Sequence, residues 1–342
     1  MKIKIVTATE ISYKILLKLG FSSDDAELVT RNIIDGELSG RKSHGLVRLQ
    51  AIKQNVGIKK LNTSSEGVEI EKESPVHLHI NAKRKSAYIA IYKSLDLAIA
   101  KAKKNGICIV GIRNAEYCSG FIGSYARYAA ENGLIFMGFN NSPHRLIPYG
   151  AKRSVWGTNP ITVSFPSQKM PVIVDMASSQ ITMGDVMVAK VEKKPLKESV
   201  AIDKDGNPTI IPEDVVAGGL LPILCNKSWG LSFHKGSALA FMVELMAGAL
   251  TGSKVGRSVE GGSRGTTYIL INPELFRPLE EFKRVIDNAV AELKNSPKAE
   301  GFDEIYFAGE KSQTLRKKHL EAGEFEISDN LYNELQNLLK EF

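Results

Sequence analysis

The sequence predicts an α/β protein with a mixed, non-Rossmann sheet and a helical lobe. Short apolar runs at 107–112, 134–139, 161–165, 172–175 and 267–271 have the length and β-branched content of buried strands. Segments of helical periodicity separate several of these runs, as in an α/β core. No Gly-x-Gly-x-x-Gly follows a predicted strand and no Walker loop occurs, so the familiar phosphate-binding folds are not indicated.

The first hundred residues are predicted to be mainly helical. Thr7-Ala8-Thr9-Glu10 has the sequence of a capping box and predicts a helix that Gly20 ends. Ser22 precedes two acidic residues and an apolar run at helical spacing, which predicts a second helix ending near Gly40. A third long helix is predicted over 84–104.

The rest of the chain carries four more helical patterns, at 123–132, 236–250, 279–294 and 329–341. The last of these is expected to pack back on the N-terminal helices. The sequence contains no internal repeat and no low-complexity segment.

Composition and charge narrow the functional classes. The 342 residues are 43% hydrophobic and carry a formal net charge of +7, with lysines in scattered pairs, so nucleic-acid binding is not expected. No stretch reaches the roughly 18 apolar residues that span a membrane, and the N-terminus lacks a signal-peptide pattern. The three cysteines have neither disulfide-framework nor metal-site spacing, which fits a cytoplasmic protein.

The segment Ser43-His44-Gly45-Leu46-Val47-Arg48 is the first candidate site. Histidine exchanges a proton near neutral pH, and the arginine fork suits a carboxylate. If the segment is helical, the imidazole and the guanidinium share one face. The alternative is a surface turn with a solvated arginine.

Two aspartates and a polar turn are further candidates. Asp175 ends an apolar strand, where a carboxylate must be paired. Asp185 is a candidate to orient the imidazole of His44, or else it caps the segment that follows. Thr158 and Asn159 precede a strand and read either as ligands or as a turn.

Two segments could meet an anion at a helix start. Cys118 to Gly123 leads from a loop into a helix, and His234-Lys235 precedes another. Helix capping is the alternative for the first, and a basic first turn for the second. Glu260 to Gly265 is interpreted as a surface loop. His77 and His79 share one strand face without an acidic or cysteine cluster, so no metal site is predicted.

The order and spacing of several motifs resemble the malate/L-lactate dehydrogenase family of non-Rossmann NAD(P)-dependent oxidoreductases, over almost the whole chain. The motifs are Ser-His-Gly-Leu-Val-Arg (43–48), Ile-Pro-Tyr-Gly-Ala-Lys (147–152), Gly-Thr-Asn-Pro-Ile (157–161), Val-Asp-Met-Ala-Ser-Ser (174–179), Asp-Lys-Asp-Gly-Asn-Pro-Thr (203–209), Leu-Leu-Pro (220–222) and Gly-Glu (309–310). The wording at 184–189 and 234–240 is most similar to the Δ1-piperideine-2-carboxylate/Δ1-pyrroline-2-carboxylate reductase branch.

This resemblance implies roles for individual residues. His44 would be the proton donor with Ser43 and Asp185 as relay partners, and Arg48, Thr158 and Gly184 would bind the substrate. The cofactor, NADPH or NADH, would contact Cys118, Ser119, Gly120, Phe121, Ile122, Asp175, Met176, Ala177, His234, Lys235, Gly309, Glu310 and Lys311.

The resemblance also implies a homodimer with the site between two domains. We divide the chain into a helical, substrate-side domain of residues 1–112 with 305–342 and a cofactor-binding domain of residues 113–304. Three features depart from the family pattern: Cys118 stands where many relatives have histidine, Met183 where an arginine is expected, and 223–233 reads as an insertion that contains Cys225 and Trp229.

The expected function is NAD(P)H-dependent reduction of a small 2-imino acid, Δ1-pyrroline-2-carboxylate or Δ1-piperideine-2-carboxylate. One alternative is a 2-hydroxy-acid dehydrogenase of malate, lactate or sulfolactate type. Another is a relative that binds a cofactor or metabolite without turnover. Met183 favours the imino acid, because malate and sulfolactate need a second cationic group.

Overall fold

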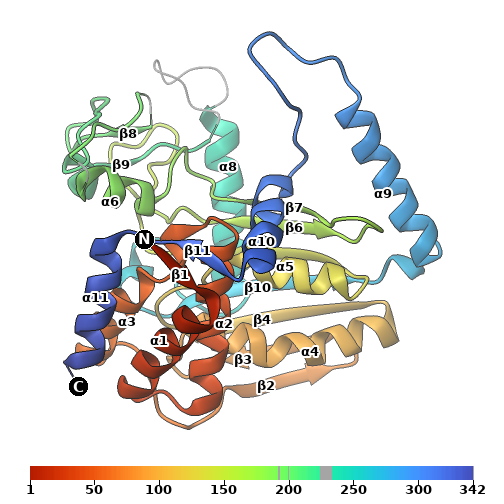
Figure 1. The fold of residues 1–342 in the computed structure, drawn as a ribbon, viewed down its shortest axis with the longest axis horizontal. Coiled ribbons are helices and arrows are strands. Elements are labelled where there is room, and N and C mark those ends of the chain that lie inside the picture. Colours follow the sequence, from red (N-terminus) through yellow and green to blue (C-terminus); the bar gives the residue numbers. More distant parts are fainter. Residues whose placement is uncertain (192, 199, 224–232, 342) are drawn as a thin grey trace.

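The computed structural model describes residues 1–191, 193–198, 200–223 and 233–341, and it confirms the predicted mixed α/β fold (Figure 1). The helices are α1 (Ile5–Lys18), α2 (Ser23–Leu38), α3 (Arg48–Gly57), α4 (Ala87–Asn105), α5 (Ile122–Glu131), α6 (Met183–Val191), α7 (Asp214–Ala217), α8 (Phe233–Glu244), α9 (Leu279–Lys294), α10 (Glu310–Ala322) and α11 (Asp329–Lys340). The strands are β1 (Lys2–Lys4), β2 (Glu69–Ser74), β3 (His77–Asn81), β4 (Ile107–Ala115), β5 (Ile135–Asn140), β6 (Ile161–Phe165), β7 (Val172–Met176), β8 (Ala201–Ile202), β9 (Gly219–Leu220), β10 (Arg264–Ile271) and β11 (Glu324–Glu326).

Seven strands form the central sheet in the order β2-β3-β4-β10-β5-β6-β7. Strands β3 and β4 pair in parallel, and the other neighbours in this order pair antiparallel. The apolar runs that predicted strands at 107–112, 134–139, 161–165, 172–175 and 267–271 are five of these seven, so their prediction is confirmed.

The sheet is covered on both faces, which explains why its central strands are largely apolar. Phe136 of β5 and Tyr268 of β10 pack in one buried cluster with residues of α4 and α5. Phe139 of β5 instead packs with Val243 and Ala247 of the α8 segment. Alternate side chains of one strand therefore serve two separate cores.

The helical lobe is built from both ends of the chain. Ile3 of β1 pairs with Phe325 of β11, and both are buried in one core with residues of α1, α2 and α11 (Figure 1). Leu335 and Leu338 of α11 are buried in this core. The predicted packing of the last helix on the N-terminal helices is confirmed.

The predicted capping box is wrong. Helix α1 begins at Ile5 with an extended Lys4 and no side-chain cap, and the Thr9 hydroxyl donates to the Ile5 carbonyl at 2.8 Å. The pairing of β1 with β11 delivers the chain into the helix two residues before Thr7, so tertiary contact overrides the local signal. The Ser22 cap is confirmed, because its side chain accepts from the Asp25 amide at 3.3 Å.

Residues 69–112 contribute β2, β3, α4 and most of β4 to the sheet layer. The division into 1–112 with 305–342 and 113–304 remains a proposal about the chain's domains.

Among the described residues, no helix is both long enough and apolar enough to cross a membrane.

Candidate active site

The segment that carries His44 is not one helix. A short 3-10 turn spans Lys42–His44, Gly45 follows, and α3 begins at Arg48. His44 and Arg48 would share a face only if the segment were helical, and this condition is not met, because Gly45 leaves the helical conformation at ψ −146°. The two side chains still meet, since Arg48 folds back and its Nε donates to the Ser43 carbonyl at 2.5 Å.

The imidazole of His44 is held neutral. Its Nδ1 lies 3.2 Å from the Ser43 Oγ. Burial, together with the charges of Arg48 and Arg41, lowers the His44 pKa to about 3, while Asp185 acts in the opposite direction. In the unliganded protein the imidazole is neutral and a weak base, and an anion bound to the arginines would raise its pKa and make it a stronger proton acceptor.

Helix α6 brings Gly184 and Asp185 to this turn. A Cβ atom at Gly184 would lie 2.6 Å from the Ser43 Cβ, so only glycine permits the close approach. The Asp185 carboxylate accepts from the Thr182 amide at 2.7 Å and from the Thr182 hydroxyl at 2.9 Å. Asp185 thus caps α6, and it acts on His44 through its charge.

Arg48 has a second guanidinium beside it that the sequence interpretation missed. Arg264, at the start of β10, lies close enough to Arg48 for their charges to interact, and both lie near Tyr117 and Cys118. Burial lowers the Arg264 pKa. In the described part of the chain, Glu116 acts on Arg264 electrostatically without a direct ion pair. The glycines of 260–265 indicate a surface loop, but in the structure Arg264 of this segment is half-buried at the start of β10.

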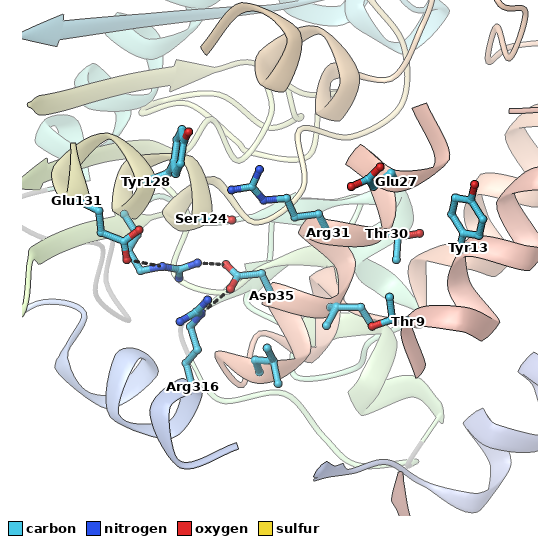
Figure 2. Close-up of a pocket in the computed structure, with 13 residues that line it drawn as sticks. Thr9, Tyr13, Glu27, Thr30, Arg31, Asp35, Ser124, Tyr128, Glu131 and Arg316 are labelled. Atoms are coloured by element: carbon cyan, nitrogen blue, oxygen red, sulfur yellow. Dashed lines mark hydrogen bonds and ion pairs between the residues drawn. The ribbon is translucent and has the colours of Figure 1, made fainter. Parts of the chain in front are cut away.

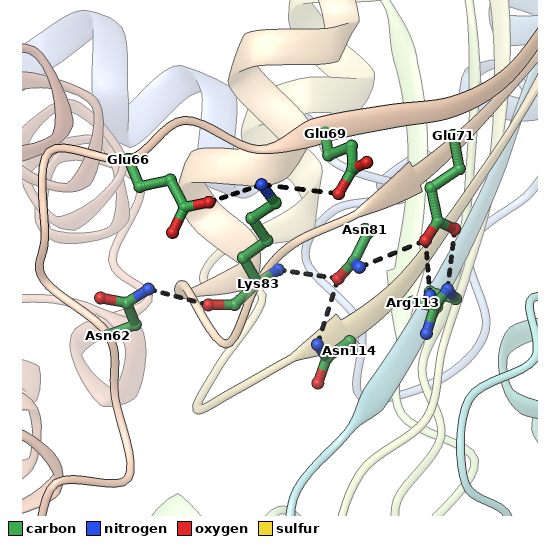
Figure 3. Close-up of polar contacts among 8 residues, drawn as sticks. All are labelled: Asn62, Glu66, Glu69, Glu71, Asn81, Lys83, Arg113 and Asn114. Carbon is green, nitrogen blue, oxygen red and sulfur yellow. Dashed lines mark hydrogen bonds and ion pairs between the residues drawn. The ribbon is translucent and has the colours of Figure 1, made fainter.

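The loop between β4 and α5 is fixed from several sides. Asn114 has a positive φ of 56°, and its amide donates to Asn81 at 3.1 Å within a polar network at the sheet edge (Figure 3). Arg113 and Glu71 form a bidentate pair in the same network. Strand β4 therefore ends in a rigid turn that leads to Tyr117 and Cys118.

In the predicted anion-binding segment Cys118 to Gly123, three backbone amides already donate to protein acceptors. The Phe121 amide donates to Asn32 Oδ1 at 2.8 Å, the Gly123 amide to Asp175 Oδ2 at 2.9 Å, and the Gly120 amide to the Cys118 sulfur at 3.2 Å. A cofactor would therefore meet this segment through Ser119, Ile122 and the side chains. Asn32 of α2 holds the backbone of this segment, and no local sequence pattern predicts this role.

Asp175 is paired, as its place after an apolar strand requires. Thr162 Oγ1 donates to it at 2.7 Å, and burial raises its pKa. Beyond it, Met176 is exposed and Ala177 is half-buried. The Thr158 carbonyl accepts from the Ser178 amide at 2.8 Å, which places Thr158 next to the same strand end.

The remaining predicted cofactor residues lie at two helix starts. His234 and Lys235 are exposed in the first turn of α8. Gly309 precedes α10 with φ 89°, and a Cβ there would lie 2.9 Å from the Ile173 carbonyl oxygen of β7. Glu310 pairs with Lys294 at 2.7 Å, and Lys311 stacks over Tyr306. Among the described residues, no cluster of metal-ligand type occurs. The predicted insertion lies mostly outside the described residues, including Cys225 and Trp229.

Comparison with known proteins identifies the family. A family model described as malate/L-lactate dehydrogenase matches residues 3–336. The malate/(S)-sulfolactate dehydrogenase of Methanothermus fervidus is 33% identical over 335 residues, which cover 96% of this chain and 94% of that protein. The crystal structure of malate dehydrogenase from Entamoeba histolytica superposes with a TM-score of 0.93 at 27% identity, covering 99% and 97% of the two chains.

A Δ1-piperideine-2-carboxylate reductase from Pseudomonas syringae superposes with a TM-score of 0.85 at 24% identity, covering 99% of each chain, and at that identity it shows the shared fold. Two further relatives name their coenzyme. The ureidoglycolate dehydrogenase of Escherichia coli K12 is NAD(+)-dependent, and the (2R)-3-sulfolactate dehydrogenase of Chromohalobacter salexigens is NADP(+)-dependent.

Proposed function

The chain belongs to the malate/L-lactate dehydrogenase family of NAD(P)-dependent oxidoreductases, and we propose that it interconverts a 2-hydroxy acid and a 2-oxo acid that carries a second anionic group. The observation that carries this proposal is the pair of guanidiniums, Arg48 and Arg264, beside the neutral imidazole of His44.

The two arginines favour a dianion. Placing two like charges together in a buried site is costly unless an anion compensates both. A substrate with one carboxylate on Arg48 and a second carboxylate or a sulfonate on Arg264 supplies this compensation. Malate and sulfolactate are substrates of this type, whereas lactate leaves one guanidinium without a partner.

The residues at the site fit an NAD(P) coenzyme. Lys235 and Lys311 stand in the first turns of α8 and α10, and Gly309 lets the start of α10 approach β7. These groups would hold the phosphates of the coenzyme. The rest of the coenzyme would contact the segments Cys118 to Ile122 and Asp175 to Ala177. When bound, the coenzyme supplies or accepts the hydride at the substrate C2 atom.

The protein's own residues move the proton and hold the substrate. In oxidation the neutral His44 accepts the proton of the C2 hydroxyl, with Ser43 at Nδ1 fixing the ring. In reduction the bound anion raises the His44 pKa, so that the imidazole can donate this proton. Asp185 assists through its charge, Thr158 would help Arg48 to hold the substrate carboxylate, and Gly184 allows the close contact of α6.

A cyclic 2-imino acid is the second candidate substrate. Met183 packs against an apolar cluster with Val186 at the start of α6, so this wall of the site offers an apolar surface and no cation. Δ1-Pyrroline-2-carboxylate or Δ1-piperideine-2-carboxylate would place its ring there and its carboxylate on Arg48. We also propose that the protein acts as a homodimer.

Initial rates of NADH and NADPH oxidation test the proposal. Oxaloacetate and 3-sulfopyruvate represent the dianions, pyruvate the monoanion, and the two cyclic imines the second candidate. We expect the dianions to give the highest kcat/KM and His44→Ala to abolish turnover. Imine-selective turnover would overturn the dianion proposal in favour of the second candidate. Coenzyme binding without turnover of any substrate would refute both.

A further inference from the structure

The turn that carries His44 rests on the last turn of α2. Glu37 in that turn is 3% exposed, and its Oε1 accepts from the Leu46 amide at 2.8 Å. The same carboxyl fills the space beside Gly45, where a Cβ atom would lie 2.1 Å from Oε1. A Cβ at Gly36 would lie 2.9 Å from the His44 carbonyl oxygen. One turn of α2 therefore contacts the backbone on both sides of the imidazole.

Helix α2 is itself held firmly. Asp35 pairs with Arg316 of α10 (Figure 2) and with Arg127 of α5, each at 2.6 Å. Residues two apart on a helix point to different sides, so these pairs hold α2 from a side other than that of Glu37. The helix is a fixed support from which Glu37 reaches the loop.

The cost of burying the Glu37 carboxylate is only partly offset by its surroundings. Burial raises its pKa to about 7, against the opposing effects of the Leu46 amide and the charge of Lys42 in the 3-10 turn. Asp35 and its two arginines belong to the other side of α2. A carboxylate in this setting lowers the stability of the fold at neutral and higher pH, so a stabilising role does not account for it.

We propose that Glu37 is a positioning residue for the reaction: by holding the Leu46 amide and occupying the space beside Gly45, it fixes the imidazole of His44 in place. The inference rests on the proposed role of His44 in proton transfer. Without Glu37 the turn loosens, water reaches the imidazole, and its pKa returns toward the ordinary value of about 6.5.

The test compares Glu37→Ala with Glu37→Gln in the purified enzyme. The alanine variant removes the acceptor of the Leu46 amide, and the glutamine variant keeps an acceptor oxygen at nearly the same place. We expect Glu37→Ala to lower kcat about tenfold or more, with an unchanged coenzyme Kd. Its kcat/KM for oxidation should gain an acid limb approaching pH ~6.5. Glu37→Gln should recover most of kcat and the wild-type pH profile.

Two further variants make the test decisive. Glu27→Ala, an exposed glutamate on the same helix, should match the wild type. Gly45→Ala presses a methyl group on the Glu37 carboxyl and should give the same pH shift; it serves if Glu37→Ala fails to fold. An unchanged pH profile in Glu37→Ala or in Gly45→Ala, or equal losses in the alanine and glutamine variants, would overturn the inference.

The parallel His44→Ala variant separates this inference from the function on which it rests. Wild-type turnover in His44→Ala refutes the proposed function. An inactive His44→Ala beside a Glu37→Ala variant of wild-type activity refutes the role of Glu37 alone.

Discussion

At the scale of single residues, the candidate site contains some groups that the local sequence indicates and others that it does not. His44 and Arg48 could be predicted, because imidazole and guanidinium side chains close together in sequence indicate proton transfer and carboxylate binding. Arg264, Asn32 and Glu37 could not. Each acts through contacts with residues far away in the chain or on another element, and nothing in their immediate sequence differs from an ordinary polar position.

The depressed pKa of His44 predicts a particular pH dependence of stability. Its folded-state pKa of about 3 lies below the ordinary 6.5, so the unfolded chain binds more protons than the folded one between these values. The contribution of His44 to the free energy of unfolding is complete above pH ~6.5. It is lost as the pH falls from there toward the folded-state pKa. We expect the free energy of unfolding, measured with urea at pH 7.5 and 5, to fall less in His44→Asn than in the wild type. An equal fall in the two proteins would contradict the lowered pKa of His44.

Arg264 is predicted to determine the preference for a dianion. Replacing it with methionine removes a charged hydrogen-bonding group from the site, which corresponds to roughly a 10- to 100-fold rise in KM for oxaloacetate. The KM for pyruvate should change much less, because pyruvate engages Arg48 alone. Arg284→Met, on the exposed side of α9, is the matched control. A proportional change for both substrates would argue against a role in selectivity.

At the scale of elements, most strands and helices could be predicted from their apolar patterns. Helix α9 has such a pattern although none of its residues is buried. The failures have a tertiary cause. The start of α1 is set by the pairing of β1 with β11 and not by Thr7, and α10 is largely polar, so periodicity gives it no signal. For residues 43–48 the sequence alone does not decide between a helix and a turn, because Gly45 is compatible with both; the structure has a 3-10 turn over Lys42–His44.

The contact of α6 with the catalytic turn gives a prediction at this scale. Gly184→Ala introduces a methyl group 2.6 Å from the Ser43 Cβ, and the helix must move away. We expect kcat/KM to fall about 100-fold, because small displacements of reacting groups are costly, while circular dichroism shows a folded protein. Gly57→Ala, where no atom lies within 4 Å of the new methyl, should retain activity. An active Gly184→Ala would mean that α6 does not set the geometry of His44.

At the scale of the whole molecule, a buried ion cluster connects the helical lobe to the sheet layer. Asp25 of α2 pairs with Lys85 and with Lys93 of α4, each at 2.7 Å, and both Asp25 and Lys85 are almost completely buried. Asp25→Asn leaves Lys85 buried without a counter-charge, so we expect a loss of about 3–5 kcal/mol in the free energy of unfolding. The exposed neighbour variant Asp24→Asn should lose far less in the same denaturant titration. Equal losses of unfolding free energy in the two variants would show that the ion cluster does not stabilise the contact between the helical lobe and the sheet layer.

The strand order of the central sheet could not be predicted from the sequence. Strand β10 lies between β4 and β5, although more than a hundred residues separate it from both. Apolar periodicity identifies strands but does not state their partners.

The pairing of β1 with β11 has a consequence for how the molecule is made. Lys2 to Lys4 find their partners only in Glu324 to Glu326, so on the ribosome the first strand must wait until nearly all of the described chain has been translated. The sheet strands β2 to β7 emerge earlier and have partners among themselves, apart from the gap that β10 fills. Vectorial synthesis therefore predicts that the N-terminal helices stay incompletely packed, and open to chaperones or proteases, until the last helices leave the exit tunnel.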